Sequence, residues 1–216
     1  YERGVRLVGS EMCIRDSMYP HILRPEEPYG LVLTFLNTLE IERGELVDTI
    51  NGPRELREWL TKAGLIHDER SRGWLECAPV LREILLEAHA LREDLLRLVE
   101  AFSLRETLSG SALFGLNRVL GVTRASVSLV ITPEKTTLAR HDWASAPLSV
   151  LAPIALDAAH LLTNTDPTRT RRCAAPQCIR WFEDTSKGGR RRWCSMQTCG
   201  NRAKAAKHRR RLSSNA

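Results

Sequence analysis

The sequence predicts a mostly α-helical protein with a small β-hairpin, in which a helical N-terminal domain precedes a small cysteine-rich module. Three observations support this fold class. Apolar residues recur at steps of three and four over residues 79–108, which is the spacing of an amphipathic helix. The spacing changes over 126–138, where β-branched and apolar residues dominate. Four of the six cysteines then lie within 173–199.

The first elements follow from short signals along the chain. Residues 31–39, LVLTFLNTL, form an apolar run that suits a buried helix or strand. Asn-Gly-Pro at 51–53 indicates a turn, and the proline fits the first turn of a helix over 53–63 that Gly64 ends. The polar stretch 67–74, HDERSRGW, is typical of a loop.

The remaining elements of the helical domain follow the long helix at 79–108. Residues 111–120, SALFGLNRVL, predict another short helix, and 126–138 predict a β-hairpin. An apolar helical pattern returns over 147–162. Residues 163–170, TNTDPTRT, have the composition of a linker, and the cysteine-rich module begins after them.

The N-terminal residues suggest a leader that does not belong to the fold. Residues 1–17 do not begin with Met, Met18 offers a start, and VGSEMCIRDS resembles a translated sequencing-adapter read. We therefore expect 1–17 to be non-native, 18–166 to form the helical domain, and 167–216 to form the cysteine-rich module with a basic C-terminal helix.

The composition excludes several classes of protein. No apolar run approaches the roughly 18 residues that span a membrane, and residues 1–30 lack the continuous apolar core of a secretory signal. We therefore expect a cytoplasmic protein with no membrane partner. No glycine-rich phosphate loop, nucleophile elbow or paired-carboxylate motif is present, and the histidines lie apart, so we do not expect an enzyme.

Charge divides the chain into two unequal parts. The 48 residues from Arg169 onward carry 14 Lys and Arg against two acidic residues, a net charge of +12. Because the whole chain carries +6, the preceding residues carry −6. A basic module on an acidic body indicates a polyanionic partner for the module.

The cysteines Cys173, Cys178, Cys194 and Cys199 have the spacing C-x4-C-x15-C-x4-C. Two close pairs separated by a loop suit four thiolates around one tetrahedral zinc ion. A redox dithiol favours C-x-x-C, and structural disulfides are rare in chains that are not exported. We therefore predict zinc on these four residues, and His208, nine residues beyond Cys199, is the less favoured alternative ligand.

The residues between the cysteines predict a treble-clef-like zinc finger. Residues 179–182 and 190–193 suit two strands that turn at the Ser-Lys-Gly-Gly of 186–189. Trp181, Phe182 and Trp193 would supply the apolar cover of so small a unit. A helix that carries Cys199 in its first turns then begins near Ser195.

This predicted helix is slim and strongly cationic, and it suits the DNA major groove, which is about 12 Å wide. Arg202 and Lys204 lie nearest the zinc site, where base edges are best reached, whereas Asn201 suits a structural hydrogen bond. The predicted nucleic-acid contacts on the helix are Arg202, Lys204, Lys207, Arg209, Arg210 and Arg211. Those on the hairpin are Arg180, Arg190, Arg191 and Arg192.

The segments CAAPQCIRWFEDTS and RWCSMQTCGNRAKAAKHRRR resemble the CGNR zinc finger, named for the four residues that stand here at 199–202. The resemblance covers 171–211 and implies that the four cysteines are zinc ligands. In that family the finger follows an ABATE domain, described as a stress-induced transcription regulator of bacteria. Residues 31–166 are similar to it in outline, through LTFLNTL, PRELREWLTKAGL and the long helix.

Together these features favour a zinc-containing, DNA-binding transcriptional regulator. The finger and basic helix would contact double-stranded DNA, while the helical domain would form a homodimer or sense a small-molecule effector. The alternative is an RNA- or ribosome-associated zinc protein whose aromatic residues stack on unpaired bases. An enzymatic role is disfavoured because four thiolates leave zinc no open position for water.

Overall fold

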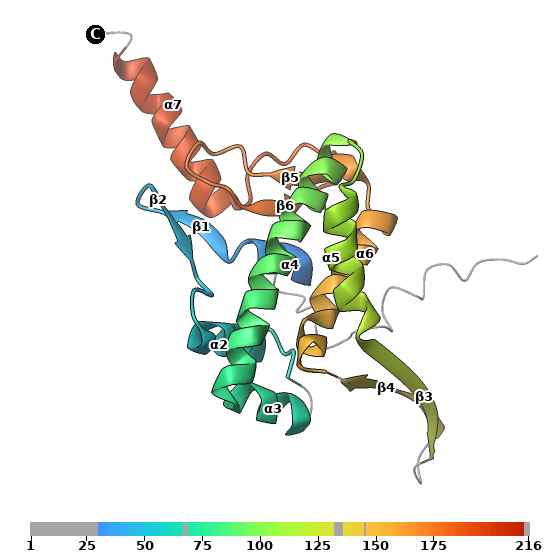
Figure 1. Ribbon diagram of the computed structural model, residues 1–216. Coiled ribbons are helices and arrows are strands. Elements are labelled where there is room, and N and C mark those ends of the chain that lie inside the picture. Colours follow the sequence, from blue (N-terminus) through green and yellow to red (C-terminus); the bar gives the residue numbers. More distant parts are fainter. Residues whose placement is uncertain (1–29, 67–68, 132–135, 145, 214–216) are drawn as a thin grey trace, which may run out of the picture.

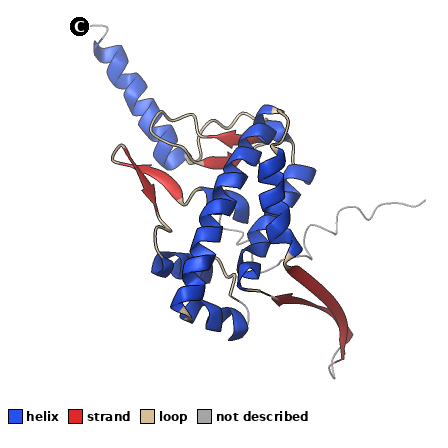
Figure 2. Cartoon of the chain, in the orientation of Figure 1, coloured by secondary structure: helices blue, strands red, loops and turns tan. Residues whose placement is uncertain are grey.

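The computed structural model describes residues 30–66, 69–131, 136–144 and 146–213. Within these ranges the chain is mostly helical and contains three two-stranded antiparallel sheets (Figures 1 and 2). This confirms the predicted fold class. None of the described helices is both long enough and apolar enough to cross a membrane. The expected leader at 1–17 and the first residues of the expected 18–166 domain lie outside the described ranges.

The elements of the helical body follow in order along the chain. They are α1 (Leu31–Leu36), β1 (Leu39–Glu42), β2 (Glu45–Asp48), α2 (Pro53–Lys62), α3 (Glu69–Glu76), α4 (Ala78–Leu104), α5 (Gly110–Gly121), β3 (Thr123–Ile131), β4 (Thr136–Ala144), η1 (Pro147–Leu151) and α6 (Ala152–Asn164). The finger follows with η2 (Pro167–Arg169), β5 (Thr170–Arg172), β6 (Trp181–Glu183), the π-helical turn η3 (Met196–Gly200) and α7 (Asn201–Ser213).

Helix α4 is the axis of the body, as its long apolar pattern predicts. The helices α1, α2, α3, α5 and α6 all contact it (Figure 1). The helix ends at Leu104, and the next residue, Arg105, adopts a left-handed conformation with φ of 58°. The apolar residues of its buried face recur at the predicted steps of three and four, and they include Leu81, Ile84, Ala88, Leu91, Leu95 and Leu98.

Helix α1 is short and is held by packing rather than by its own length. Five of its six residues are buried. The apolar run at 31–39 thus forms a buried helix, and β1 begins at its last residue. Its first amides are capped from another element, because Asp157 on α6 accepts a hydrogen bond of 2.7 Å from the amide of Val32. Burial raises the pKa of Asp157, although this hydrogen bond opposes the rise.

The β1–β2 hairpin and the helix α3 were not predicted by the sequence patterns. Strands β1 and β2 form a hairpin whose turn residues, Arg43 and Gly44, have φ of 53° and 91°, as a tight primed turn requires. The prediction of a loop at 67–74 is wrong for most of these residues, because Glu69–Glu76 forms α3. The side chain of Leu75 is buried in the core, so tertiary contact stabilises a helix that its polar composition disfavours.

A buried ion pair joins the β1–β2 hairpin to α4. Arg92 is only 5% exposed, and its guanidinium donates to both carboxylate oxygens of Asp48 and, over 2.7 Å, to the hydroxyl of Thr38. Burial would raise the pKa of Asp48, but the hydrogen bonds from Arg92 and from the amide of Ile50 outweigh it and lower the pKa. The charged pair therefore fixes the hairpin to the body at neutral pH.

Asp48→Asn is expected to lower the free energy of unfolding by about 3 kcal/mol at neutral pH, because it leaves the Arg92 charge buried without its counter-ion. Since the native pKa of Asp48 is lowered, its contribution is present above the unfolded pKa of about 3.9 and is lost as the pH falls through the native value. Denaturant titrations across acidic pH should therefore show that the free energy of unfolding depends less on pH in the variant than in the wild type. Glu55→Gln, on an exposed pair with Arg54, is the control, and an equal loss there would contradict this assignment.

Candidate metal centre and basic helix

The four predicted cysteine ligands come together in one cluster. The sulfur atoms of Cys173, Cys178, Cys194 and Cys199 all lie within 4.8 Å of one another. Cys194 Sγ lies 3.7 Å from Cys178 Sγ and 3.7 Å from Cys199 Sγ. Four sulfurs bound to one zinc at about 2.3 Å in a tetrahedron stand about 3.8 Å apart, so these spacings fit the ion. They are too long for disulfide bonds, and His208 is not part of the cluster.

Local backbone structure places each pair of cysteines. The amide of Cys173 donates to the carbonyl of Arg180 over 2.9 Å, and that of Cys178 donates to Ala175 over 3.0 Å, which forms a tight first knuckle. In the second knuckle, Cys199 lies in the π-helical turn η3. The hydroxyl of Ser195 caps this turn by accepting from the amide of Thr198. The cluster is buried with Phe182, which supplies its apolar cover as predicted.

The strand pairing of the finger differs from the prediction. Strand β6 pairs with β5 through Arg171 and Phe182, and 190–193 forms no strand. The physical reason is that the amide of Arg191 donates to the carboxylate of Asp184 instead of to a ladder partner. The turn expected at 186–189 is present, with Gly189 at a φ of 58°.

Hydrogen bonds to two of the sulfur atoms favour their thiolate form, which is the form that binds a metal ion. The amide of Cys194 donates to Cys173 Sγ, and the guanidinium of Arg202 donates to Cys199 Sγ, both over 3.4 Å. Burial raises the pKa of Cys178 to about 11 and also raises that of Cys194. Burial would raise the pKa of Cys199 too, but hydrogen bonds from the other thiols and from Arg202 lower it. Four crowded sulfurs can all be thiolates only beside a cation, which zinc supplies.

Each residue of the sequence CGNR has a physical role at this centre. Cys199 is a ligand. Gly200 leaves space that a side chain would not, because a Cβ there would lie 2.5 Å from Met196 Sδ and 3.1 Å from Trp193 Cδ1. Asn201 donates to the carbonyl of Gln197 over 3.1 Å, in keeping with the structural hydrogen bond expected for it. Arg202 donates to the ligand sulfur of Cys199, a contact that the sequence analysis did not predict.

Asp184 is the main structural residue that sequence reasoning missed in the finger. Its side chain is fully buried and accepts hydrogen bonds from the amides of Ser186 and Arg191 and from the Ser186 hydroxyl. Burial would raise the pKa of Asp184, but these hydrogen bonds and the nearby charge of Arg171 lower it. The signal in the sequence was Asp-Thr-Ser before a glycine turn, a pattern typical of a side-chain-capped turn.

Trp181 is placed differently from its expected role. Its side chain is 6% exposed and belongs to the core of the helical body, whereas Phe182 faces the cysteines. The backbone of Trp181 also makes a two-way contact with Asn37: its amide donates to Asn37 Oδ1 over 2.8 Å, and Asn37 Nδ2 donates to its carbonyl over 2.9 Å. The finger is therefore docked on the body through β6.

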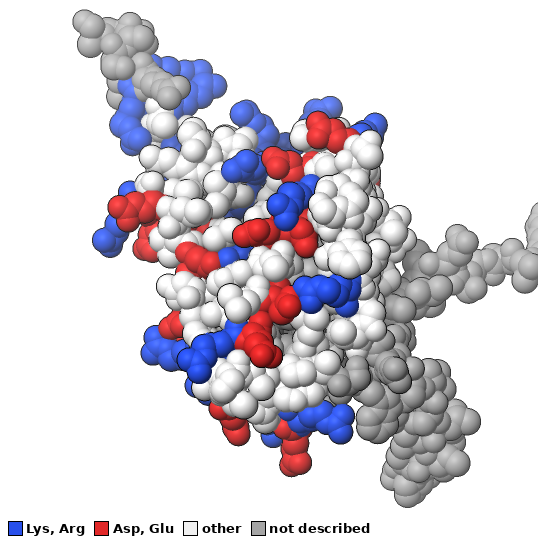
Figure 3. All heavy atoms as spheres, viewed as in Figure 1, with Lys and Arg blue, Asp and Glu red and all other residues white. Residues whose placement is uncertain are grey.

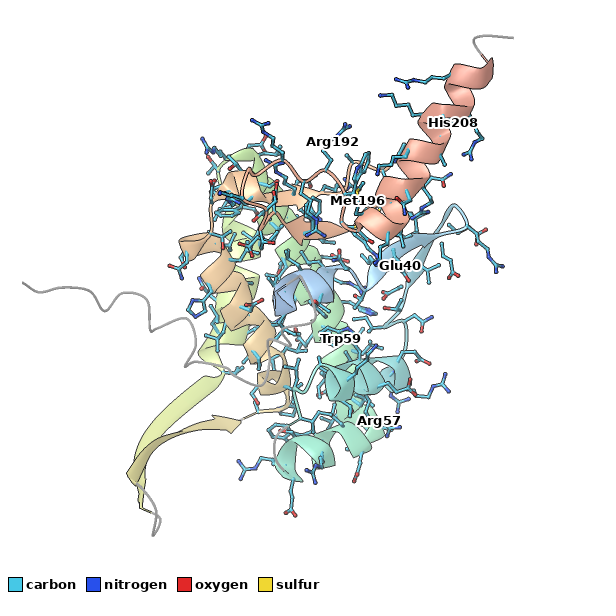
Figure 4. All side chains as sticks on the ribbon, turned by 180° about the vertical axis from the view of Figure 1, so that it is seen from behind. Glu40, Arg57, Trp59, Arg192, Met196 and His208 are labelled. Atoms are coloured by element: carbon cyan, nitrogen blue, oxygen red, sulfur yellow. The ribbon has the colours of Figure 1, made fainter. Side chains whose placement is uncertain are left out.

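The predicted hairpin contacts have different environments. Arg180 is paired with Glu40. Figure 4 shows Glu40 on the β1–β2 hairpin. The guanidinium of Arg191 lies 4.9 Å from the Phe182 ring centre and donates to the carbonyls of Trp193 and Cys194. Arg192 is exposed above the ring of Trp193, and Arg190 is exposed beside the glycine turn.

The predicted helix contacts lie on α7, which projects away from the body (Figure 1). Lys and Arg gather on this projection, whereas Lys, Arg, Asp and Glu are mixed over the visible face of the body (Figure 3). Their side chains are exposed at Arg202, Lys204, Lys207, Arg209 and Arg211. The side chain of Arg210 lies outside the described residues, and His208 is also exposed, well along the helix (Figure 4).

Two family models match the chain in the order that the resemblance implies. The CGNR zinc finger matches residues 169–212, and ABATE, whose description is "Putative stress-induced transcription regulator", matches residues 30–165. No curated protein matches the chain. The family match and the four-sulfur geometry identify zinc as the metal of the finger. The ABATE match covers more than half of the chain. The chain therefore belongs to the ABATE family, and it carries a C-terminal CGNR zinc finger.

Proposed function

We propose that the protein is a DNA-binding transcriptional regulator whose finger and basic helix contact double-stranded DNA. The observation that carries this proposal is the placement of α7, a slim cationic helix that begins at the zinc site and projects from a body of net negative charge. Zinc fixes the start of the helix, so its exposed side chains leave the finger in a defined direction. A projecting helix of this kind suits insertion into a major groove.

The environments of the basic residues narrow the proposed contacts. The charge of Arg180 is balanced by Glu40, and the guanidinium of Arg191 is used by carbonyls inside the finger. We assign the phosphate contacts to the exposed cations of α7 together with Arg190. Arg202 also holds a ligand sulfur, so it supports the zinc site and only its remaining donors can reach a base edge.

The burial of the aromatic residues favours duplex DNA over the alternative of RNA binding. Stacking on unpaired bases needs exposed rings. Phe182 is completely buried, Trp181 is 6% exposed, and Trp193 is partly buried with the Arg192 guanidinium 5.0 Å from its ring centre. The zinc has a structural role in this proposal, because four thiolates leave it no open position.

For the helical body we propose the roles that the sequence suggests, dimerisation or the sensing of a small effector. Helices α4 and α5 expose two large apolar side chains, Leu86 and Phe114, at 70% and 73%. A contact between copies of the chain through α4 and α5 would cover these two side chains. Measuring the mass of the protein in solution tests this part of the proposal separately from DNA binding.

Salt dependence tests the DNA contacts. Log affinity for duplex DNA should fall against log salt with a slope of about −0.9 per phosphate neutralised. Replacing Arg209, Arg210 and Arg211 with alanine should flatten that slope by about two to three units and weaken all sequences alike. The matched control replaces three exposed cations of the body, Arg57, Lys62 and Arg72, and an equal change there would contradict the proposed contacts.

Arg202→Ala should instead reduce discrimination between a selected site and random duplex, because a base contact is worth about 1–3 kcal/mol. Zinc content must be measured in the same samples, since Arg202 also contacts Cys199. If the variant keeps its zinc and loses no discrimination, Arg202 serves only the metal centre.

A further inference from the structure

A cleft of about 580 Å³ lies where the finger meets the body, and the zinc site does not use it. One wall is the C-terminal end of α4, with Ser103 and Leu104. The opposite wall is the finger, with Thr170 and Arg172 on β5, Trp181 on β6 and Arg192 on the loop before Cys194. A volume of this size is within the range of small-molecule sites, which often occur between domains.

Thr170, one of the lining residues, has a hydroxyl without a hydrogen-bond partner. Thr170 is 1% exposed, and in the part of the chain that the structure describes its Oγ1 is the one buried side-chain polar atom without a hydrogen-bond partner. A buried polar atom without a partner costs free energy, so folded proteins rarely leave one. A bound molecule that reaches this hydroxyl through a small shift of the cleft wall would supply the missing partner.

The charge of the cleft selects an anion. Arg172 and Arg192 are exposed, and neither has a carboxylate partner among the described residues. The Trp193 ring, 5.0 Å from the Arg192 guanidinium, supports that side chain on one face. Two further arginines in the lining, Arg171 and Arg191, are held by contacts inside the finger, and Glu100 is the one acidic residue among the lining residues.

The apolar surface of the cleft adds a second requirement. Leu104 is 61% exposed at the end of α4, and Trp181 lines the opposite wall. An ion such as free phosphate would leave this surface uncovered. An organic anion would cover Leu104 with its carbon skeleton while its charged group meets the arginines.

We propose that this cleft binds a small organic anion, with a phosphate or carboxylate group between Arg172 and Arg192 and a polar atom that bonds Thr170 Oγ1 once a small shift of the cleft wall exposes it. The bound molecule would contact α4 and the finger at once, and so it would change how firmly the finger is held on the body. An effect of this molecule on DNA affinity rests on the proposed function, whereas its binding does not.

Calorimetric titration of the zinc-loaded full chain without DNA tests the proposal. The probes are phenyl phosphate, benzoate and inorganic phosphate at one ionic strength. We expect saturable binding of at least one aromatic anion, and the comparison of the first two identifies phosphate or carboxylate as the preferred group. Failure of both to bind at millimolar concentration, or equal binding of inorganic phosphate, would overturn the proposal.

Two variants locate the site. Arg172→Gln combined with Arg192→Gln should weaken the bound probe about tenfold or more. The control removes the same charge at Lys187 and Arg190, which do not line the cleft. It should leave the affinity for the probe unchanged. Thr170→Val should weaken the probe without lowering the melting temperature of the free protein, because the lost hydroxyl had no partner.

The competing interpretation is that the cleft arginines contact nucleic acid. In that case the double glutamine variant would lose affinity for duplex DNA while its affinity for the probe stayed the same, and the anion site would be wrong. Loss of probe binding with unchanged DNA binding supports the site even if the proposed DNA contacts on α7 fail their own test.

Discussion

Replacing Cys194 with serine is expected to release the zinc and unfold the finger, reducing the metal content from about one zinc per chain to none. Cys194 Sγ is 3.7 Å from two other ligand sulfurs, so its loss opens the centre of the cluster. In small zinc modules the binding free energy, about 10–16 kcal/mol, is also the folding free energy. The helical body should keep its fold at a lower stability, because its core is formed mainly by α1 to α6 and loses only the contribution of Trp181 from the finger.

Metal analysis and far-ultraviolet circular dichroism of the reduced protein check this result. Cys77→Ser is the matched control, because Cys77 is exposed and lies outside the cluster. The control should retain its zinc and its helical signal. A Cys194→Ser protein that still carries one zinc per chain, or a wild-type protein that carries iron, would contradict the site.

Trp181→Ala is expected to lower the free energy of unfolding by about 3–5 kcal/mol and to separate the unfolding of the finger from that of the body. Trp181 is the residue through which the finger enters the core of the body, and Asn37 holds its backbone. The zinc ligands are untouched, so the metal content should not change. The effect is therefore on how the two domains are joined.

Denaturant unfolding followed by circular dichroism, together with zinc release, measures both parts of this prediction. Leu46→Ala provides the control, since that side chain is 64% exposed on the β1–β2 hairpin. A Trp181→Ala protein with the stability of the control would show that β6 merely touches the body. Loss of zinc in the variant would show that Trp181 supports the finger itself.

The long helices and the metal ligands were predictable because their signals are local. The period of apolar residues in α4 records which face packs inward, and the cysteine spacing records the two knuckles of the metal site. The charge division also depended only on counting residues.

The missed features depend on partners that are distant in the sequence. The helix α3 is stabilised by the core around Leu75, and the pairing of β5 with β6 depends on Asp184 taking the amide of Arg191. Trp181 and Phe182 are adjacent, yet they face different cores because neighbouring residues of a strand point to opposite sides. No pattern within the finger shows that one of these sides meets the body.

The central claim is that a zinc-held basic helix binds duplex DNA. The measurement that tests it most directly compares the affinity of the zinc-loaded full chain for random duplex DNA with that for single-stranded RNA of equal length at one salt concentration. Tighter binding to the duplex, lost in Cys194→Ser, is the predicted result. Tighter binding to RNA, or duplex binding that survives the loss of zinc, would contradict the claim.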